Sequence, residues 1–172
     1  MAVAFGQLCL TTVLFWSGLL KLRDVSAFRR HVDTTLPRLG GGLSAALALA
    51  VPAVEVAAAG LLLIRPWAWL GCAVATLLLL AFTGYLIGLM RSRPDASCGC
   101  AGADDTPVSE VHVLRNALLL TVCVLTWWAT VRTGGPDLAG YAVVAAPAAV
   151  CGIALLHLGE LVSFFRPPPR TT

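Results

Sequence analysis

Apolar residues dominate this chain in five long runs, separated by shorter polar segments. The runs cover about residues 2–22, 43–64, 66–90, 112–131 and 139–164. Each run is close to the roughly 20 residues that a helix needs to cross the ~30 Å hydrocarbon core of a bilayer. Lipid offers no water to backbone polar groups, so such runs are expected to be helices. The pattern predicts an all-α, multi-pass transmembrane bundle, with four core helices and a fifth, formed by residues 1–165 as one domain.

The later runs are less uniform than the first three. Polar residues (His112, Arg115 and Asn116) occupy the first turns of the fourth run, and the fifth run contains Pro147. Residues 166–172 follow with three consecutive prolines between two arginines. Proline cannot continue a helix, so we expect this tail to be disordered.

Composition supports a lipid environment. Hydrophobic residues make up 58% of the 172 residues and charged residues only 12%, whereas soluble domains average about 25% charged residues. Mean hydropathy is +0.85. The net charge of +3 is small and scattered, which argues against a nucleic-acid partner.

The distribution of basic residues predicts the orientation in the membrane. No basic residue precedes the first run and no small-x-small site precedes Lys21, so we expect a retained helix rather than a signal peptide. Nine basic residues fall on one side: Lys21, Arg23, Arg29, Arg30, Arg38, Arg91, Arg93, Arg166 and Arg170. Only Arg65 and Arg132 fall on the other. The positive-inside rule predicts an outer N-terminus, a cytoplasmic C-terminus and a cytoplasmic loop around Cys98 and Cys100.

The clearest candidate chemistry is Cys98-Gly99-Cys100, which lies in the polar loop before the fourth run. A disulfide across one intervening residue closes a small, strained ring, and strained disulfides are oxidising and labile. His112 and Arg115 lie near the start of the next helix, where a positive field would favour the thiolate. Three aspartates in the loop oppose this effect: Asp95, Asp104 and Asp105.

Three interpretations of the thiol pair stay open. It is a redox-active dithiol, an inert loop, or a zinc or copper site formed by Cys98, Cys100 and His112. The metal site has no apparent fourth ligand.

Polar residues within the apolar runs form a second set of candidates. An ionisable group in mid-membrane, such as Glu55, is a functional hypothesis by default, and Pro52 frees a backbone carbonyl close to it. The alternative is a neutral glutamate bonded to another helix. Lys21, Arg115 and Asn116 are expected level with the thiol loop, where Lys21 and Arg115 could instead extend to the lipid headgroups.

Four further cysteines lie in apolar runs: Cys9, Cys72, Cys123 and Cys151. Buried cysteine is usually an inert, small hydrophobic residue. Cys9 and Cys72 are expected about 10 and 9 Å inside the same face of the membrane, so they could form a second thiol pair.

Four motifs in order resemble the methylamine-utilisation MauE family, which is related to DoxX-like membrane proteins. They are Ser17-Gly18-Leu-Leu-Lys21-Leu-Arg23-Asp24, Pro52-Ala-Val-Glu55, Cys98-Gly-Cys100 and His112-Val-Leu-Arg115-Asn116. The resemblance implies a small bacterial inner-membrane protein that works beside a thioredoxin-like partner. In methylamine utilisation this pair supports disulfide formation in the small subunit of methylamine dehydrogenase, but MauE-like proteins also occur outside that pathway, so the resemblance does not imply the substrate. Ala101 departs from the family, where an aromatic residue is expected.

Together these features favour a thiol–disulfide electron relay of oxidoreductase type, which serves a thioredoxin-like partner in extracytoplasmic disulfide formation or isomerisation. Cys98 and Cys100 would cycle between dithiol and disulfide, Arg115 would supply the positive field, and Glu55 or His112 would handle protons. One alternative is a quinone-linked disulfide-forming enzyme of the vitamin K epoxide reductase type, with its thiols on the outer face. Another is a non-catalytic assembly or anchoring protein.

Overall fold

The computed structural model describes residues 1–37, 40–92, 109–133 and 135–165, and the regular structure in these ranges is helical. Five described helices are long and apolar enough to cross a membrane: Ala2–Arg23, Gly41–Leu63, Arg65–Ser92, Glu110–Thr133 and Leu138–Leu156. The prediction of an all-α, multi-pass bundle with a fifth spanning helix is confirmed.

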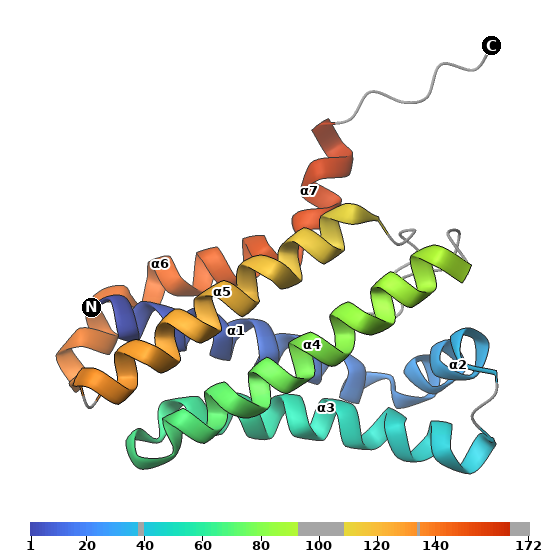
Figure 1. Ribbon diagram of the computed structural model, residues 1–172, viewed down its shortest axis with the longest axis horizontal. Helices are drawn as coiled ribbons and strands as arrows, with labels where there is room; N and C mark the ends of the chain where they lie inside the picture. Colours follow the sequence, from blue (N-terminus) through green and yellow to red (C-terminus); the bar gives the residue numbers. More distant parts are fainter. Residues whose placement is uncertain (38–39, 93–108, 134, 166–172) are drawn as a thin grey trace.

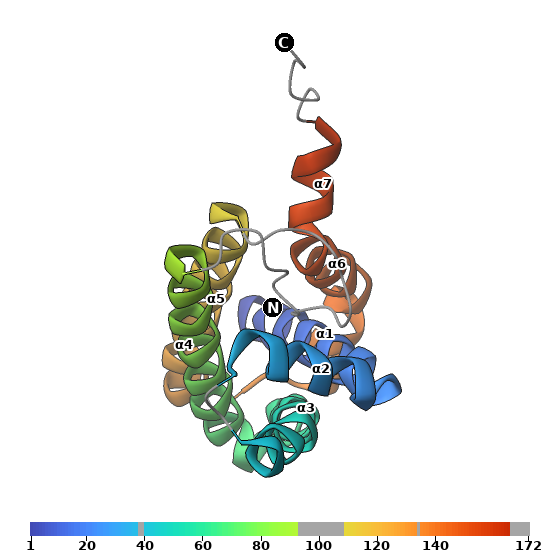
Figure 2. The same ribbon diagram turned by 90° about the vertical axis from the view of Figure 1, so that its right-hand side faces the viewer.

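The bundle is built around its first helix (Figures 1 and 2). Helix α1 (Ala2–Arg23) packs against α3 (Gly41–Leu63), α5 (Glu110–Thr133) and α6 (Leu138–Leu156). A short 3₁₀ turn, η1 (Arg65–Trp67), leads from α3 into α4 (Ala68–Ser92), and α4 packs on both α3 and α5. Large apolar side chains cover the outside, with Leu77, Val131 and Val150 each more than 60% exposed. A surface of this kind is suited to lipid.

The segment between the first two spans contains a helix that the sequence analysis did not predict. Helix α2 (Val25–Thr35) begins at Asp24, whose Oδ1 accepts a hydrogen bond of 2.8 Å from the Ala27 amide. Phe28 and Val32 are one helical turn apart and pack on Ala48 of α3. The spacing of Phe28 and Val32 is a weak signal among the neighbouring charged residues, and those charges predicted only the orientation in the membrane.

The last apolar run, expected as one segment over 139–164, is divided in the structure. Helix α6 ends at Leu156 and α7 (Leu158–Phe165) turns away from it (Figure 1). In a continuous helix the Leu156 carbonyl would bond to the amide four residues later. Here it accepts a hydrogen bond of 3.2 Å from Arg115 Nη1, so a side chain of α5 satisfies the end of α6.

One end of the bundle collects most of the polar residues, and we call it the polar end. Helix α1 ends there beside α2, α4 also ends there, and α3 and α5 begin there (Figure 1). Ser92 and Ser109 therefore flank the segment with the Cys98–Cys100 motif at this end. Cys98, Cys100 and the tail 166–172 lie outside the described residues.

Candidate functional site

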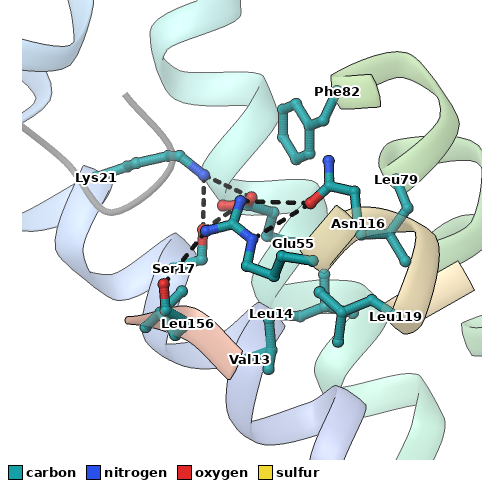
Figure 3. A pocket seen from close by; sticks show the side chains of 11 residues that line it. Val13, Leu14, Ser17, Lys21, Glu55, Leu79, Phe82, Asn116, Leu119 and Leu156 are labelled. Carbon is teal, nitrogen blue, oxygen red and sulfur yellow. Dashed lines mark hydrogen bonds and ion pairs between the residues drawn. The ribbon is translucent and has the colours of Figure 1, made fainter. Parts of the chain in front are cut away.

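A fully buried ion pair joins α1 to α3 near the polar end. Lys21 Nζ lies 2.6 Å from Glu55 Oε1, and the two side chains are only 2% and 1% exposed. Ser17, one turn before Lys21, bridges them: its hydroxyl accepts from Lys21 at 2.7 Å and donates to Glu55 at 3.2 Å. Figure 3 shows the three side chains meeting between the helices. Lys21 is thus buried and does not extend to the headgroups.

Gly18 makes this pair possible by allowing α1 and α3 to approach closely. A Cβ atom at this position would lie 3.0 Å from the Pro52 carbonyl oxygen and 2.9 Å from Val56 Cγ2. A larger residue would therefore push the helices apart. Separation of the helices would lengthen the contact between Lys21 and Glu55.

A second polar group comes from the first turns of α5. Arg115 is 6% exposed and Asn116 is 2% exposed. The Arg115 guanidinium donates to the Leu156 carbonyl at 3.2 Å and to Asn116 Oδ1 at 3.3–3.4 Å. Asn116 Nδ2 in turn donates to Thr83 Oγ1 of α4 at 3.4 Å. These bonds tie α4, α5 and α6 together, so Arg115 is also buried.

The two groups line one small cavity, and we call them together the polar cluster: Ser17, Lys21, Glu55, Arg115 and Asn116. The cavity holds about 30 Å³, which is enough for a water molecule. Its remaining walls are apolar, including Leu79 and Phe82 of α4 (Figure 3).

The polar cluster carries an excess of positive charge. Glu55 balances Lys21, whereas the described hydrogen bonds of Arg115 go to two neutral acceptors, a backbone carbonyl and an amide oxygen. Because the surroundings are apolar, this charge acts with little screening. Such a charge favours an anion over a neutral group close to it.

His112 lies on the first turn of α5 and is 5% exposed. Its Nδ1 accepts a hydrogen bond of 3.2 Å from the Ser109 amide and lies 3.1 Å from the Ser109 hydroxyl. With Nδ1 as acceptor, a neutral ring carries its proton on Nε2. Nε2 faces α7, because a Cβ atom at Gly159 would be 3.1 Å from it. His112 lies one helical turn before Arg115 and Asn116 on α5 and does not line the cavity.

The structure pairs the described cysteines across neighbouring helices. Cys9 lies beside Cys151 of α6, and Cys72 lies beside Cys123 of α5. Cys123 Sγ also donates to the Cys72 carbonyl and accepts from Thr76 Oγ1, both at 3.3 Å. We call Cys72, Thr76 and Cys123 the thiol contact. The expected partners Cys9 and Cys72 therefore each lie beside a different thiol, and all four cysteines are free.

Sequence reasoning named Lys21, Glu55, Arg115 and Asn116, and the structure brings these four together. The sequence pattern assigned no role to Ser17 or Thr83, although Ser17 precedes Lys21 by one helical turn. One alternative drawn from the sequence was a metal site formed by Cys98, Cys100 and His112. Of these three residues, only His112 lies in the described part of the chain.

Comparison with known proteins gives two matches. A family model described as methylamine utilisation protein MauE matches residues 1–129. The methylamine utilization protein MauE of Paracoccus denitrificans is 38% identical over 124 residues. That alignment covers 70% of this chain and 62% of the relative, so the chain spans less than two thirds of the length of that relative. No solved structure matches.

Proposed function

Because the chain belongs to the MauE family, we propose that it is a membrane thiol–disulfide electron relay in which Cys98 and Cys100 cycle between dithiol and disulfide. Its partner is a thioredoxin-like protein, and its pathway is methylamine utilisation, where it supports extracytoplasmic disulfide formation or isomerisation. The proposal includes the location, which is a bacterial inner membrane with an outer N-terminus and a cytoplasmic C-terminus.

One observation carries this proposal: the polar cluster is buried and has excess positive charge at the bundle end where the segment with Cys98 and Cys100 begins and ends. Thiol–disulfide exchange needs a thiolate as the attacking group. Arg115 is a positioning residue in this scheme, because its field stabilises the thiolate. The fixed hydrogen bonds of Arg115 keep that field in place.

The exchange also requires movement of protons. When Cys98 and Cys100 form a disulfide, two electrons and the two protons of the cysteines pass to the partner, whose disulfide becomes a dithiol; this direction supports isomerisation. The return step runs the same exchange with a thioredoxin-type reductant. Disulfide formation needs the reverse exchange, in which the partner's dithiol becomes a disulfide and the Cys98–Cys100 disulfide becomes a dithiol. Glu55, with Ser17 and Lys21 around it, and His112 are the groups that hold protons near the thiols. The cavity beside Glu55 is large enough for a water molecule, which could connect the carboxylate with the polar end.

Alkylation of cysteines in living cells tests the relay directly. Cells are quenched with acid, thiols are modified with a maleimide of added mass, and the protein is separated by gel. We expect Cys98 and Cys100 to change between two modified states when the partner or its reductant is deleted. The matched control is Cys72→Ser with Cys123→Ser, which removes a buried thiol pair and should leave the shift unchanged.

Two results would contradict the relay. The first is an active protein whose Cys98 and Cys100 never change state. The second is full function of the variant with Cys98→Ser and Cys100→Ser while the partner still copurifies. The second result would support the anchoring alternative, in which the membrane protein only recruits a soluble oxidoreductase.

A further inference from the structure

Arg115 is a buried cation without a carboxylate partner among the described residues. Its side chain is 6% exposed, and its hydrogen bonds go to the Leu156 carbonyl and to Asn116 Oδ1, which are both neutral acceptors. Arginine keeps its proton in proteins, so a positive charge remains in an apolar interior. Arg115 belongs to none of the ion pairs in the described part of the chain, which are Lys21–Glu55, Arg29–Asp33 and His157–Glu160.

A buried charge of this kind favours a counter-ion. Removal of an ion from water is costly, and buried charges in proteins are normally paired for this reason. The Glu55 carboxylate is 2.6 Å from Lys21 Nζ, where it offsets the charge of the lysine. The charge of Arg115 is therefore the excess of the polar cluster. A single positive charge is best balanced by a monovalent anion.

Hydrogen-bond donors for an anion are present beside this charge. A guanidinium has five N–H groups, and the hydrogen bonds of Arg115 use three of them, so one remains on each of Nη1 and Nη2. Asn116 Nδ2 has two N–H groups and donates one to Thr83 Oγ1. Arg115 and Asn116 both line the small cavity. Figure 3 shows the polar ends of Lys21, Glu55 and Asn116 turned toward one another there.

The size of the small cavity limits the kind of anion that it can hold. Its volume is about 30 Å³, which is room for one species of about the size of water. Phosphate, sulfate and carboxylate groups have several heavy atoms each and do not fit. A halide ion is a single atom. The apolar part of the wall, which includes Val13, Leu79 and Leu119, leaves the ion to the N–H groups of Arg115 and Asn116.

We propose that the small cavity binds a halide ion, with chloride as the natural ligand. The remaining N–H groups of Arg115 and Asn116 donate to the ion, and its charge offsets that of the guanidinium. Water could accept the same hydrogen bonds but carries no charge, so chloride and water compete for a cavity that holds one of them at a time. This inference goes beyond the relay and does not rest on it, because none of the donors belongs to Cys98 or Cys100.

Equilibrium binding of radioactive chloride to the full chain in lipid nanodiscs tests the site. The protein carries Cys98→Ser and Cys100→Ser, so no thiolate competes with the ion and the outcome is independent of the relay. Gluconate keeps the ionic strength constant, because it screens exposed arginines and is too large for the cavity. We expect saturable binding of one chloride per chain, which bromide displaces. Binding that does not saturate, or that gluconate displaces as well as bromide does, would overturn the proposal.

A first variant, made in the same protein, removes the charge. Arg115→Gln keeps an N–H donor but is neutral, so chloride should bind at least about tenfold more weakly, as expected for the loss of one charged hydrogen bond. Chloride binding as tight as that of the protein with Arg115 would show that the guanidinium does not hold the ion, and the proposal would fail.

A pair of matched variants locates the ion in the cavity and keeps every charge, so it decides the question even if Arg115→Gln does not fold. Val13→Leu adds one methylene group to the wall of the small cavity and should abolish saturable binding. Val122→Leu adds the same group beside the same apolar core but outside this cavity, and it should leave binding unchanged. Equal chloride binding by the two variants would overturn the proposal.

Discussion

The polar cluster and the thiol contact are both buried in the same bundle, but burial has very different consequences for them. Lys21, Glu55 and Arg115 are charged groups with exposures of 1–6%. Cys72 and Cys123 are both 0% exposed and are surrounded by apolar neighbours such as Leu62 and Leu79. A buried charge loses its hydration, whereas a buried thiol behaves as a small hydrophobic residue.

This difference indicates where function should be sought. Leu or Met in place of each charged residue would pack in lipid without any partner. The sequence instead places cations on two helices and a carboxylate on a third, with hydrogen bonds that hold them in position. Intramembrane charges of this kind typically mark functional sites. The thiol contact needs no such explanation, since cysteine is readily accommodated in an apolar core.

The largest effect should follow from breaking the buried ion pair. In Lys21→Met, Glu55 loses the ammonium at 2.6 Å and stays buried. We expect the free energy of unfolding to fall by about 3–5 kcal/mol, the range for removing one partner of a buried pair. Unfolding in mixed micelles, followed by circular dichroism, measures this change.

A double variant separates the stabilisation that comes from the ion pair from the effects of the two single substitutions. Lys21→Met with Glu55→Gln removes both charges, so most of the lost stability should return. The thiol contact supplies the control, because Cys72→Ala with Cys123→Ala should show no comparable coupling between its two substitutions. If the double charge variant is as unstable as the sum of the single variants, the two side chains do not stabilise each other.

A smaller effect is expected from Arg115. In Arg115→Met the Leu156 carbonyl and Asn116 Oδ1 lose their charged donor. Loss of such bonds should reduce the free energy of unfolding by about 1.5–3 kcal/mol. Hydrogen exchange should increase first in α7, because the bend after Leu156 depends on this side chain. Slower alkylation of Cys98 and Cys100 at fixed pH would further support the positioning role, and Arg115→Lys should restore that rate in part.

Much of this fold was predictable because each spanning helix has a strong local signal. The five apolar runs predicted the spans, and positions along these runs placed Lys21 and Arg115 near one membrane surface, whereas Glu55 was expected in mid-membrane. Helix α2 was missed because its two buried residues, Phe28 and Val32, are weak signals beside its charges. The bend at His157 was missed because it depends on Arg115, which is 41 residues from Leu156.

The partners of the cysteines could not be predicted from depth alone. Cys9 and Cys72 were expected at similar depths, but depth does not determine which way a residue faces around its helix. Packing fixes that rotation. Cys9 meets α6 at Gly152, where a Cβ atom would lie 3.1 Å from the Cys9 carbonyl oxygen. An apolar helix provides little sequence pattern from which such a contact could be recognised.

The thiol contact should be almost silent in comparison. Cys123→Ala removes one small side chain and weak hydrogen bonds, so we expect a loss of about 1 kcal/mol and an unchanged relay. A hydrophilic maleimide should not modify Cys9, Cys72 or Cys123 in intact membranes, since each is at most 1% exposed. Mass spectrometry of the alkylated protein measures this. A Cys72–Cys123 disulfide that forms and disappears during turnover would give the thiol contact a function and end the contrast with the polar cluster.

The smallest effect should come from Asp24, a charged residue at the polar end that is exposed to solvent. Its carboxylate caps α2 by accepting from the Ala27 amide and from the Ser26 hydroxyl, and these bonds lower its pKa below the usual 3.8. A lowered pKa means that the ionised cap stabilises the folded state at neutral pH. This stabilisation is lost only as the pH falls through the folded-state pKa, below about pH 4.

Asp24→Ala should therefore loosen α2 at pH 7 without unfolding the bundle, and Asp24→Asn should largely preserve the cap, since asparagine is also a good N-cap residue. Hydrogen exchange of the α2 amides measures both variants, with the α5 amides as internal reference. The difference between Asp24→Ala and the unaltered protein should shrink as the pH falls through the lowered pKa of Asp24, because the protonated carboxyl group is a weaker acceptor than the carboxylate. If hydrogen exchange rises equally in α2 and α5, the exposed cap at Asp24 is energetically coupled to the buried polar cluster. The cap and the polar cluster would then not be independent of each other.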